Sequence, residues 1–132
     1  MITRIVMDIN DGAGGGSAFN DTGPGLVGEL VQMRWDPVQA DTGADLALEQ
    51  MLTGAADTGD MYRFYNDNDV LGTSFTKCVR QSTHDVSGDP YDTGGDFREP
   101  IFFAGEKVRA RITPGDTGHI EGNLYLWVRN EH

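Results

Sequence analysis

The strongest constraint on the fold is a two-residue alternation of apolar and polar side chains near the end of the chain. It is plainest in residues 107–112 and 124–129. In the second segment, one face consists of Leu124, Leu126 and Val128, and the other consists of Tyr125, Trp127 and Arg129. Successive side chains of a β-strand point to opposite faces, so each segment predicts a strand with one face in a core.

The same period of two recurs through much of the remaining sequence. In LVGELVQMRW, residues 26–35, the two faces are Val27, Val31, Met33, Trp35 and Leu26, Leu30, Gln32. Further candidate strands are DLALEQML, MYRFY, TSFTKCVRQ and PIFFA, and turn signals separate nearly all of them, at Asp36-Pro37, Gly54, 66–69, 87–90, Gly105 and Pro114-Gly115. Short strands at this spacing predict an all-β fold, an antiparallel β-sandwich or partly open barrel. Only ADLALEQMLTG, residues 44–54, fits a helical period as well.

Length, composition and charge agree with one β-rich domain. The 132 residues suffice for a single core, and a hydrophobic content of 38% with 18 glycines suits a fold with many turns. Ten basic and 21 acidic residues give a net charge of −11. Such a surface repels phosphate backbones, so we expect no nucleic-acid partner. No apolar run spans a bilayer and MITRIVMDI lacks the features of a signal peptide, so we expect a soluble protein without a membrane partner, not exported by the general secretory route.

A glycine-rich stretch divides the N-terminal region from the rest. Residues 11–25, DGAGGGSAFNDTGPG, cannot form a helix or a regular strand interior. We therefore predict a strand and flexible arm over residues 1–25 and a β-sandwich domain over residues 26–132. The strand Ile2 to Ile9 either reaches a neighbouring subunit on this tether or belongs to a long hairpin.

The triplet Asp-Thr-Gly raises the possibility of an aspartic protease, in which Asp41 would be catalytic. It begins at five positions, Asp21, Asp41, Asp57, Asp92 and Asp116. A catalytic motif used once per subunit does not recur at five loops, whereas Asp caps a turn and Gly adopts its positive φ. Asp41 also follows the polar segment WDPVQA instead of a buried strand. We interpret the triplets as turns and predict no catalytic residues.

Other residue types with catalytic or ligating chemistry lack the required partners. His84, His119 and His132 have no neighbour at metal-ligand spacing, and the lone Cys78 lies in an alternating run that predicts a buried thiol. The serines lack a nucleophile elbow, and DGAGGG has no following Lys-Ser/Thr. We therefore predict a protein that is not an enzyme.

Calcium is the one cofactor for which the sequence supplies suitable ligands. Oxygen donors cluster in NDND, residues 66–69, and at Asp8, Asn10 and Asp11. Neither cluster has the spacing of a calcium-binding loop with its distant Glu. We expect charged loops and no cofactor, with calcium as the alternative.

Apolar and aromatic side chains supply the candidate interface. Trp35, Tyr125 and Trp127 either form an exposed set that contacts another protein chain or complete the core beneath a loop. The N-terminal strand adds apolar positions that could join a neighbour's sheet edge. The candidate interface residues are Ile2, Ile5, Met7, Ile9, Trp35, Tyr125 and Trp127.

From Trp35 onward the order of motifs resembles a known family. WDP, DTGADL, DTGD, SFTKCVRQSTH and REPIFFAGEKVRARITPGDTGHIEGNLYLWV follow one another as in small β-rich structural proteins of tailed viruses of bacteria and archaea. The resemblance covers roughly residues 34 to 129 and is most specific in DTGADL and the closing run. The glycine-rich arm departs from it, and DTGDMYRFYNDND is more acidic than the family pattern.

This resemblance implies a structural role in the virion, as a capsid decoration protein on the outer surface of the viral head. The implied partners are the major capsid protein and further copies of the chain, after synthesis in the host cytoplasm. An acidic surface suits a position outside the shell, away from the genome. Two alternatives remain: a tail or head-to-tail component, and a carbohydrate-binding module in which Trp35, Tyr125 and Trp127 stack on sugar rings beside calcium.

Overall fold

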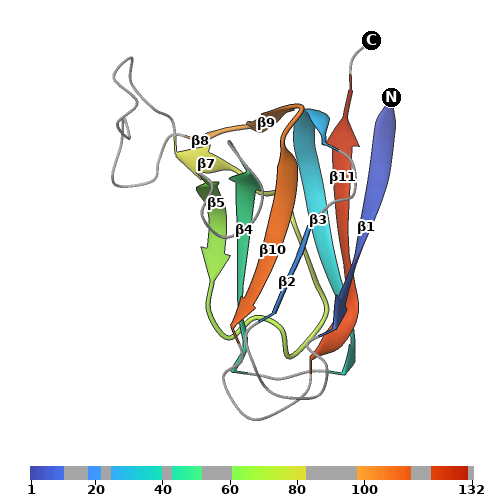
Figure 1. The fold of residues 1–132 in the computed structure, drawn as a ribbon, viewed down its shortest axis with the longest axis vertical. Coiled ribbons are helices and arrows are strands. Elements are labelled where there is room, and N and C mark those ends of the chain that lie inside the picture. Colours follow the sequence, from blue (N-terminus) through green and yellow to red (C-terminus); the bar gives the residue numbers. More distant parts are fainter. Residues whose placement is uncertain are drawn as a thin grey trace.

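The computed structural model describes residues 1–10, 18–21, 25–39, 43–51, 61–82, 98–113 and 120–130. Every regular element in these ranges is a β-strand, and all strand pairs are antiparallel (Figure 1). The predicted all-β class is therefore confirmed.

Two sheets form the body of the molecule. Sheet A has the order β1-β11-β3-β6, and β9 also pairs with β3. Its strands are β1 (Ile2–Asn10), β11 (Glu121–Arg129), β3 (Val27–Gln39), β6 (Phe75–Lys77) and β9 (Ile101–Ala104). Sheet B has the order β2-β10-β4-β5, with strands β2 (Ala18–Asp21), β10 (Lys107–Thr113), β4 (Asp45–Met51) and β5 (Met61–Asp67). A separate short pair joins β7 (Gln81–Ser82) to β8 (Arg98–Glu99).

The core lies between the inner faces of the two sheets, as in a β-sandwich. Alternate residues of β11 supply one side, and alternate residues of β4 and β10 supply the other. Phe64 of β5 meets Phe103 of β9 edge to face, with ring centroids 5.8 Å apart. The chain crosses from sheet A to sheet B at Gly105, which joins β9 to β10. Its φ of 110° is a backbone conformation that suits glycine.

Trp35 is the largest fully buried side chain. Its indole Nε1 donates a hydrogen bond of 3.1 Å to the carbonyl of Leu71, which satisfies its one polar group inside the core. Gly122 on β11 makes room for the ring, since a Cβ at that position would lie 2.6 Å from the indole. The core alternative for Trp35 is therefore correct.

Strand β3 contains two irregularities that the sequence pattern hides. Trp127 pairs with Gln32 but its neighbour Val128 pairs with Leu30, so one extra residue bulges between them. The bulge puts Leu30 on the same buried face as Met33 and Trp35, although simple alternation places Leu30 on the opposite face. A second shift lies near Pro37, so the predicted turn at Asp36-Pro37 is wrong and β3 continues to Gln39.

The segment with competing helical and strand periods is strand β4. It pairs with β10 on one side and β5 on the other. Leu46 and Leu48 point into the core, whereas Glu49 points away from it. Six of its seven residues are buried, so packing on both faces decides a choice that the local pattern left open.

The N-terminal strand is part of the sandwich. Strand β1 pairs with β11 over nine residues, and β2 pairs with β10 in the other sheet. Met7 and Ile9 are buried in the core. The described parts of residues 1–25 therefore belong to the two sheets, and a division into arm and sandwich at residue 25 does not follow the strand pairing. The glycine-rich residues 11–17 lie outside the described ranges.

Candidate interaction surface

The outer face of sheet A carries alternate side chains of three neighbouring strands. Strand register places them in four rows across β1, β11 and β3. We call this surface the aromatic face; its rows are Ile2, Arg129, Glu29; Arg4, Trp127, Gln32; Val6, Tyr125, Arg34; and Asp8, Asn123, Asp36. None of these side chains is fully buried, whereas their neighbours Met7, Leu126 and Met33 lie in the core.

Two rings form the centre of the aromatic face. Tyr125 and Trp127 lie with ring centroids 6.0 Å apart and planes inclined by 30°. The guanidinium of Arg4 stands over the Tyr125 ring, 5.3 Å from its centroid. Val6 beside them is about half exposed, at 49%. Tyr, Trp and Arg are the residues most enriched at the energetic centres of protein interfaces, so this cluster has the composition of a binding site.

Arg34 is held in place at the side of the rings. Its Nη2 lies 2.8 Å from Asp36 Oδ1, and its Nη1 donates a 2.8 Å hydrogen bond to Thr76 Oγ1 on β6. A long side chain fixed by two partners loses less conformational entropy when another molecule binds over it.

The charges of the aromatic face balance although the chain is strongly acidic. Its rows contain three arginines and three carboxylates, within a chain of net charge −11. Glu29 lies 3.6 Å from Arg80 Nη1 and 3.9 Å from Arg129 Nη1. The aromatic face therefore adds little to the long-range repulsion of an acidic partner.

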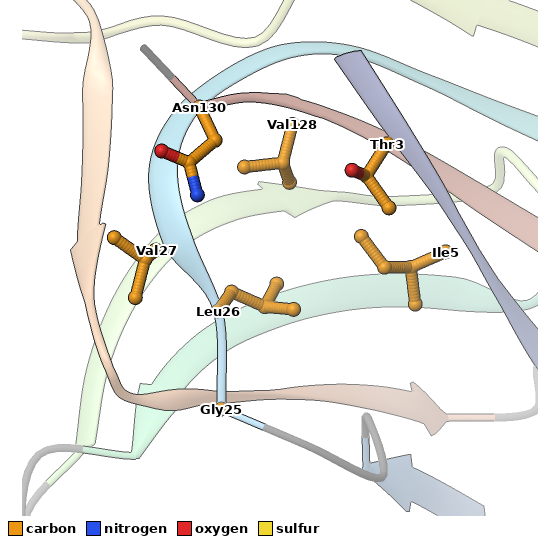
Figure 2. A pocket seen from close by; sticks show the side chains of 7 residues that line it. All are labelled: Thr3, Ile5, Gly25, Leu26, Val27, Val128 and Asn130. Atoms are coloured by element: carbon orange, nitrogen blue, oxygen red, sulfur yellow. The ribbon is translucent and has the colours of Figure 1, made fainter. Parts of the chain in front are cut away.

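A recess of about 270 Å³ lies at one end of the sandwich, beside the first row of the aromatic face. Figure 2 shows Ile5, Leu26 and Val128 forming its apolar wall, with Thr3 and Asn130 contributing polar atoms. Phe102, 62% exposed, borders a second hollow with Glu29 and Arg129. Of the apolar side chains at this end of the molecule, Phe102 is exposed and Ile5 is half-buried, whereas Leu26 and Val128 are buried.

The outer side of sheet B differs in its contacts. Glu49 is buried, and its two carboxylate oxygens accept from two arginines. Arg63 Nη2 lies 3.0 Å from Oε2, and Arg111 Nε lies 3.2 Å from Oε1. Arg109 beside them is 2% exposed. Paired and buried charge of this kind serves the fold, because breaking it would leave a buried ion without its counter-charge.

A third polar cluster joins the edges of the two sheets. Lys77 Nζ of β6 lies 2.8 Å from Asp67 Oδ2 and 3.3 Å from the Tyr65 hydroxyl, both on β5. The hydrogen bond from Lys77 lowers the pKa of Asp67, and the same bond raises the pKa of Lys77. Burial raises the pKa of Tyr65, so its phenol stays neutral. The cluster is an inter-sheet tie.

The NDND segment, residues 66–69, supplied candidate calcium ligands. Its side chains and backbone are instead held by hydrogen bonds within the fold. Asp67 Oδ1 accepts from the Asn68 amide, and Asp45 accepts from the Asp69 amide at 3.0 Å. Asp69 has a φ of 58°, as in a tight turn. Among the described residues no group of three or more acidic, His or Cys side chains could hold a metal ion. The Asp8 cluster extends into residues outside the described ranges.

The predicted interface residues separate into three groups. Tyr125, Trp127 and Ile2 lie on the aromatic face, and Ile2 is 53% exposed. Ile5 is half-buried against the core and lines the recess. The other three, Met7, Ile9 and Trp35, are in the core, so their assignment to an interface is wrong for this fold. In the alternating pattern of their strands, these three residues occupy the positions whose side chains point into the core.

Sequence reasoning also missed basic members of the surface. Arg4 and Arg34 flank the aromatic rings, and a selection of apolar residues leaves them out. The signal was present in MITRIVMDI, where Arg4, Val6 and Asp8 alternate with the apolar set. The predicted buried Cys78 is likewise wrong, since its side chain is exposed.

Several remaining expectations concern positions that the structure does not describe. His84, His119 and His132 lie outside the described ranges, as do Asp41, Asp57, Asp92 and Asp116 of the Asp-Thr-Gly triplets. Asp21 ends strand β2, and Gly43 lies in a turn before β4. The interpretation of the triplets as turns stays a prediction. The described ranges contain no helix with the length and hydropathy needed to cross a membrane.

Comparisons with known proteins were made by family models, by curated sequences and by solved structures, and none of the three found a match.

Proposed function

We propose that the protein is a non-enzymatic structural protein of a virion, which binds the outer surface of the viral head and stabilises it. The observation that carries this proposal is the aromatic face, where Tyr125, Trp127 and Arg4 form a pre-arranged cluster on an otherwise acidic molecule. Such a cluster suits attachment to a protein surface. The sequence resemblance implies that the protein surface to which this chain attaches belongs to the major capsid protein.

The aromatic face has the physical properties that attachment to a repeating shell requires. It lies on a sheet backed by a close-packed core, so its side chains keep fixed positions. Each copy need bury only a standard interface of about 1,600 Å², because capsid symmetry repeats the contact many times. The net charge of −11 then faces solvent and keeps neighbouring particles apart.

The test uses heads that are assembled from the major capsid protein of the same virus and lack their outer layer. We expect electron microscopy of heads mixed with purified protein to show a stoichiometric layer that follows the capsid symmetry. The double variant Tyr125→Ser and Trp127→Ser should remain folded and lose this layer. Lys107→Ala, which changes an exposed residue of sheet B, should bind as the unchanged protein does.

Heads that stay bare with folded, unchanged protein would refute the proposal. Binding to purified tails instead would support the tail alternative. The carbohydrate alternative is weakened because Trp35, one of its three stacking residues, is fully buried.

A further inference from the structure

Arg4 differs from the other two arginines of the aromatic face in its charge partners. Arg34 and Arg129 lie 2.8 and 3.9 Å from carboxylates of the same face. The Arg4 side chain is exposed, and its guanidinium carbon stands 5.3 Å from the centroid of the Tyr125 ring. Within the described residues, neither an ion pair nor a side-chain hydrogen bond accompanies this ring contact. The positive charge of Arg4 is therefore not matched inside the described part of the fold.

The guanidinium of Arg4 keeps its capacity to bind an anion while it stands over the ring. A guanidinium has five N–H donors in one plane, and it can lie against an aromatic ring while these donors bind an acceptor. A carboxylate fits this fork of donors best, because its two oxygens accept two parallel hydrogen bonds. Arg4 thus offers a set of donors for a carboxylate beside Tyr125 and Trp127.

A partner that covers the two rings must also cover Arg4. The guanidinium stands over one of the rings, so the surface that excludes water from Tyr125 excludes it from Arg4 as well. Burying a cation without a counter-charge is costly. Arg34 avoids this cost because Asp36 is buried with it. For Arg4, the counter-charge has to come from the partner.

We propose that the aromatic face recognises a protein segment with an Asp or Glu carboxylate that binds Arg4 and an adjacent apolar side chain that covers Tyr125 and Trp127. This inference rests on the proposed function, and it names the chemistry of the group on the viral head to which the chain attaches. Arg4 is paired directly with Trp127 across β1 and β11. Side chains so paired start about 5 Å apart, so the acidic and apolar groups of the partner belong to one short segment of its surface.

The first test compares substitutions of Arg4 by their affinity for heads that lack the outer layer. Arg4→Gln should raise the Kd at least about thirtyfold, because the partner carboxylate is then buried without a counter-charge. Arg4→Lys keeps the net charge but loses the paired donors, so we expect a smaller rise, about three- to tenfold. Lys107→Gln is the matched control: it removes one positive charge from an exposed residue of sheet B and should leave the Kd unchanged.

The second test removes the carboxylates of the partner. Heads are treated with a carbodiimide and a neutral amine, which converts exposed carboxylates to amides, and electron microscopy confirms that they stay intact. The measured quantity is the ratio of the Kd of Arg4→Gln to that of the unchanged protein. We expect this ratio to fall from about thirty on untreated heads to about one on amidated heads. The changed charge of the head acts almost equally on both proteins, so the ratio reports the contact with Arg4.

Three results would overturn the inference while leaving the proposed function intact. They are a layer formed equally well by folded Arg4→Gln, an Arg4→Lys variant with unchanged affinity, and a ratio that stays near thirty on amidated heads. The second would mean that Arg4 acts only through long-range charge, and the third that it contacts a group other than a carboxylate. Untreated heads that stay bare with unchanged protein would refute the proposed function itself, and this inference with it. Far-UV circular dichroism confirms that each variant is folded.

Discussion

The outer sides of the two sheets carry charges of both signs but use them differently. On sheet B, Glu49 is buried between Arg63 and Arg111, and six of the seven residues of β4 are buried. On sheet A, β11 alternates strictly between buried and half-buried residues, and its outward Tyr125 and Trp127 lie beside each other on the aromatic face. The charges on sheet B are paired within the fold, whereas the outer side of sheet A keeps partly exposed aromatic rings.

This contrast shows how an exposed aromatic can be distinguished from a structural one. A buried polar group needs a partner inside the molecule, so a closed network such as that of Glu49 indicates a role in stability. Aromatic rings that lie beside arginines on a partly exposed sheet face bury additional apolar surface when a partner covers them, which favours binding. The contrast predicts that substitutions on the two sides separate loss of stability from loss of binding.

The largest expected difference is between the two tryptophans. Trp35→Ala should lower the free energy of unfolding by about 3–5 kcal/mol, because it leaves a cavity in the core and removes a satisfied hydrogen bond. Trp127→Ala should lower it by about 1 kcal/mol, since that ring is partly in solvent already. Urea unfolding followed by circular dichroism measures both. Equal losses would remove the distinction between the core and the aromatic face.

The next comparison is between two glutamates. Glu49→Gln should cost about 1.5–3 kcal/mol of stability, because it weakens the charge-assisted hydrogen bonds of a buried side chain to two partly exposed arginines. Glu29→Gln is the matched change on the aromatic face, where the arginines lie 3.6 and 3.9 Å away, and should cost under about 1 kcal/mol. A larger effect at Glu29 would show that the aromatic face is also structural.

A smaller effect is expected where the two sides of sheet A differ in packing. Gly122→Ala should destabilise the protein by about 1–3 kcal/mol, because the new Cβ meets the indole of Trp35 and the carbonyl of Asp36. Asn123→Ala, one position along on the aromatic face, should change stability little. Thermal unfolding of the two variants measures both effects. If Gly122→Ala left the stability unchanged, the packing around Trp35 would have to adjust to the new methyl group without cost, which contradicts this account.

The smallest expected effect is the pH dependence of the inter-sheet tie. The pKa of Asp67 is lowered by Lys77, so the pair stabilises the folded state above about pH 4 and loses this contribution as pH falls through the folded pKa. Asp67→Asn should therefore cost about 0.2–1 kcal/mol at pH 7 and nothing at about pH 2.

The raised pKa of Lys77 sets the alkaline limit of the same contribution, which is lost as pH rises through its folded value. Chemical denaturation of both proteins across this range measures the difference. A stability difference that is constant from acid to neutral pH would contradict the ion-pair account.

Much of the fold could be predicted from the sequence because alternation reports burial directly. The strands around Val108 and Leu126 were predicted, and in both the aliphatic side of the alternation lies in the core. The bulge near Leu30 could not be predicted, since one extra residue reverses the phase without altering composition. Strand β4 stayed ambiguous because its outward Glu49 is buried by charge pairing, which no periodicity reveals.

The candidate site was predicted only in part. Tyr125 and Trp127 were identified because they oppose an aliphatic face, and this opposition is local. The assignment of Trp35 depended on the space beside Gly122, which is distant in sequence and unknowable without the pairing of β3 with β11. The arginines became visible as neighbours of the rings only when β1 and β3 took their places on either side of β11.

The most direct test of the account is hydroxyl-radical footprinting of the protein on viral heads, compared with the free protein. We predict that Tyr125 and Trp127 become protected on binding, while Tyr65 on sheet B keeps its reactivity. Protein that is bound to heads with Trp127 unprotected and Tyr65 protected would contradict the claim that the aromatic face is the attachment surface.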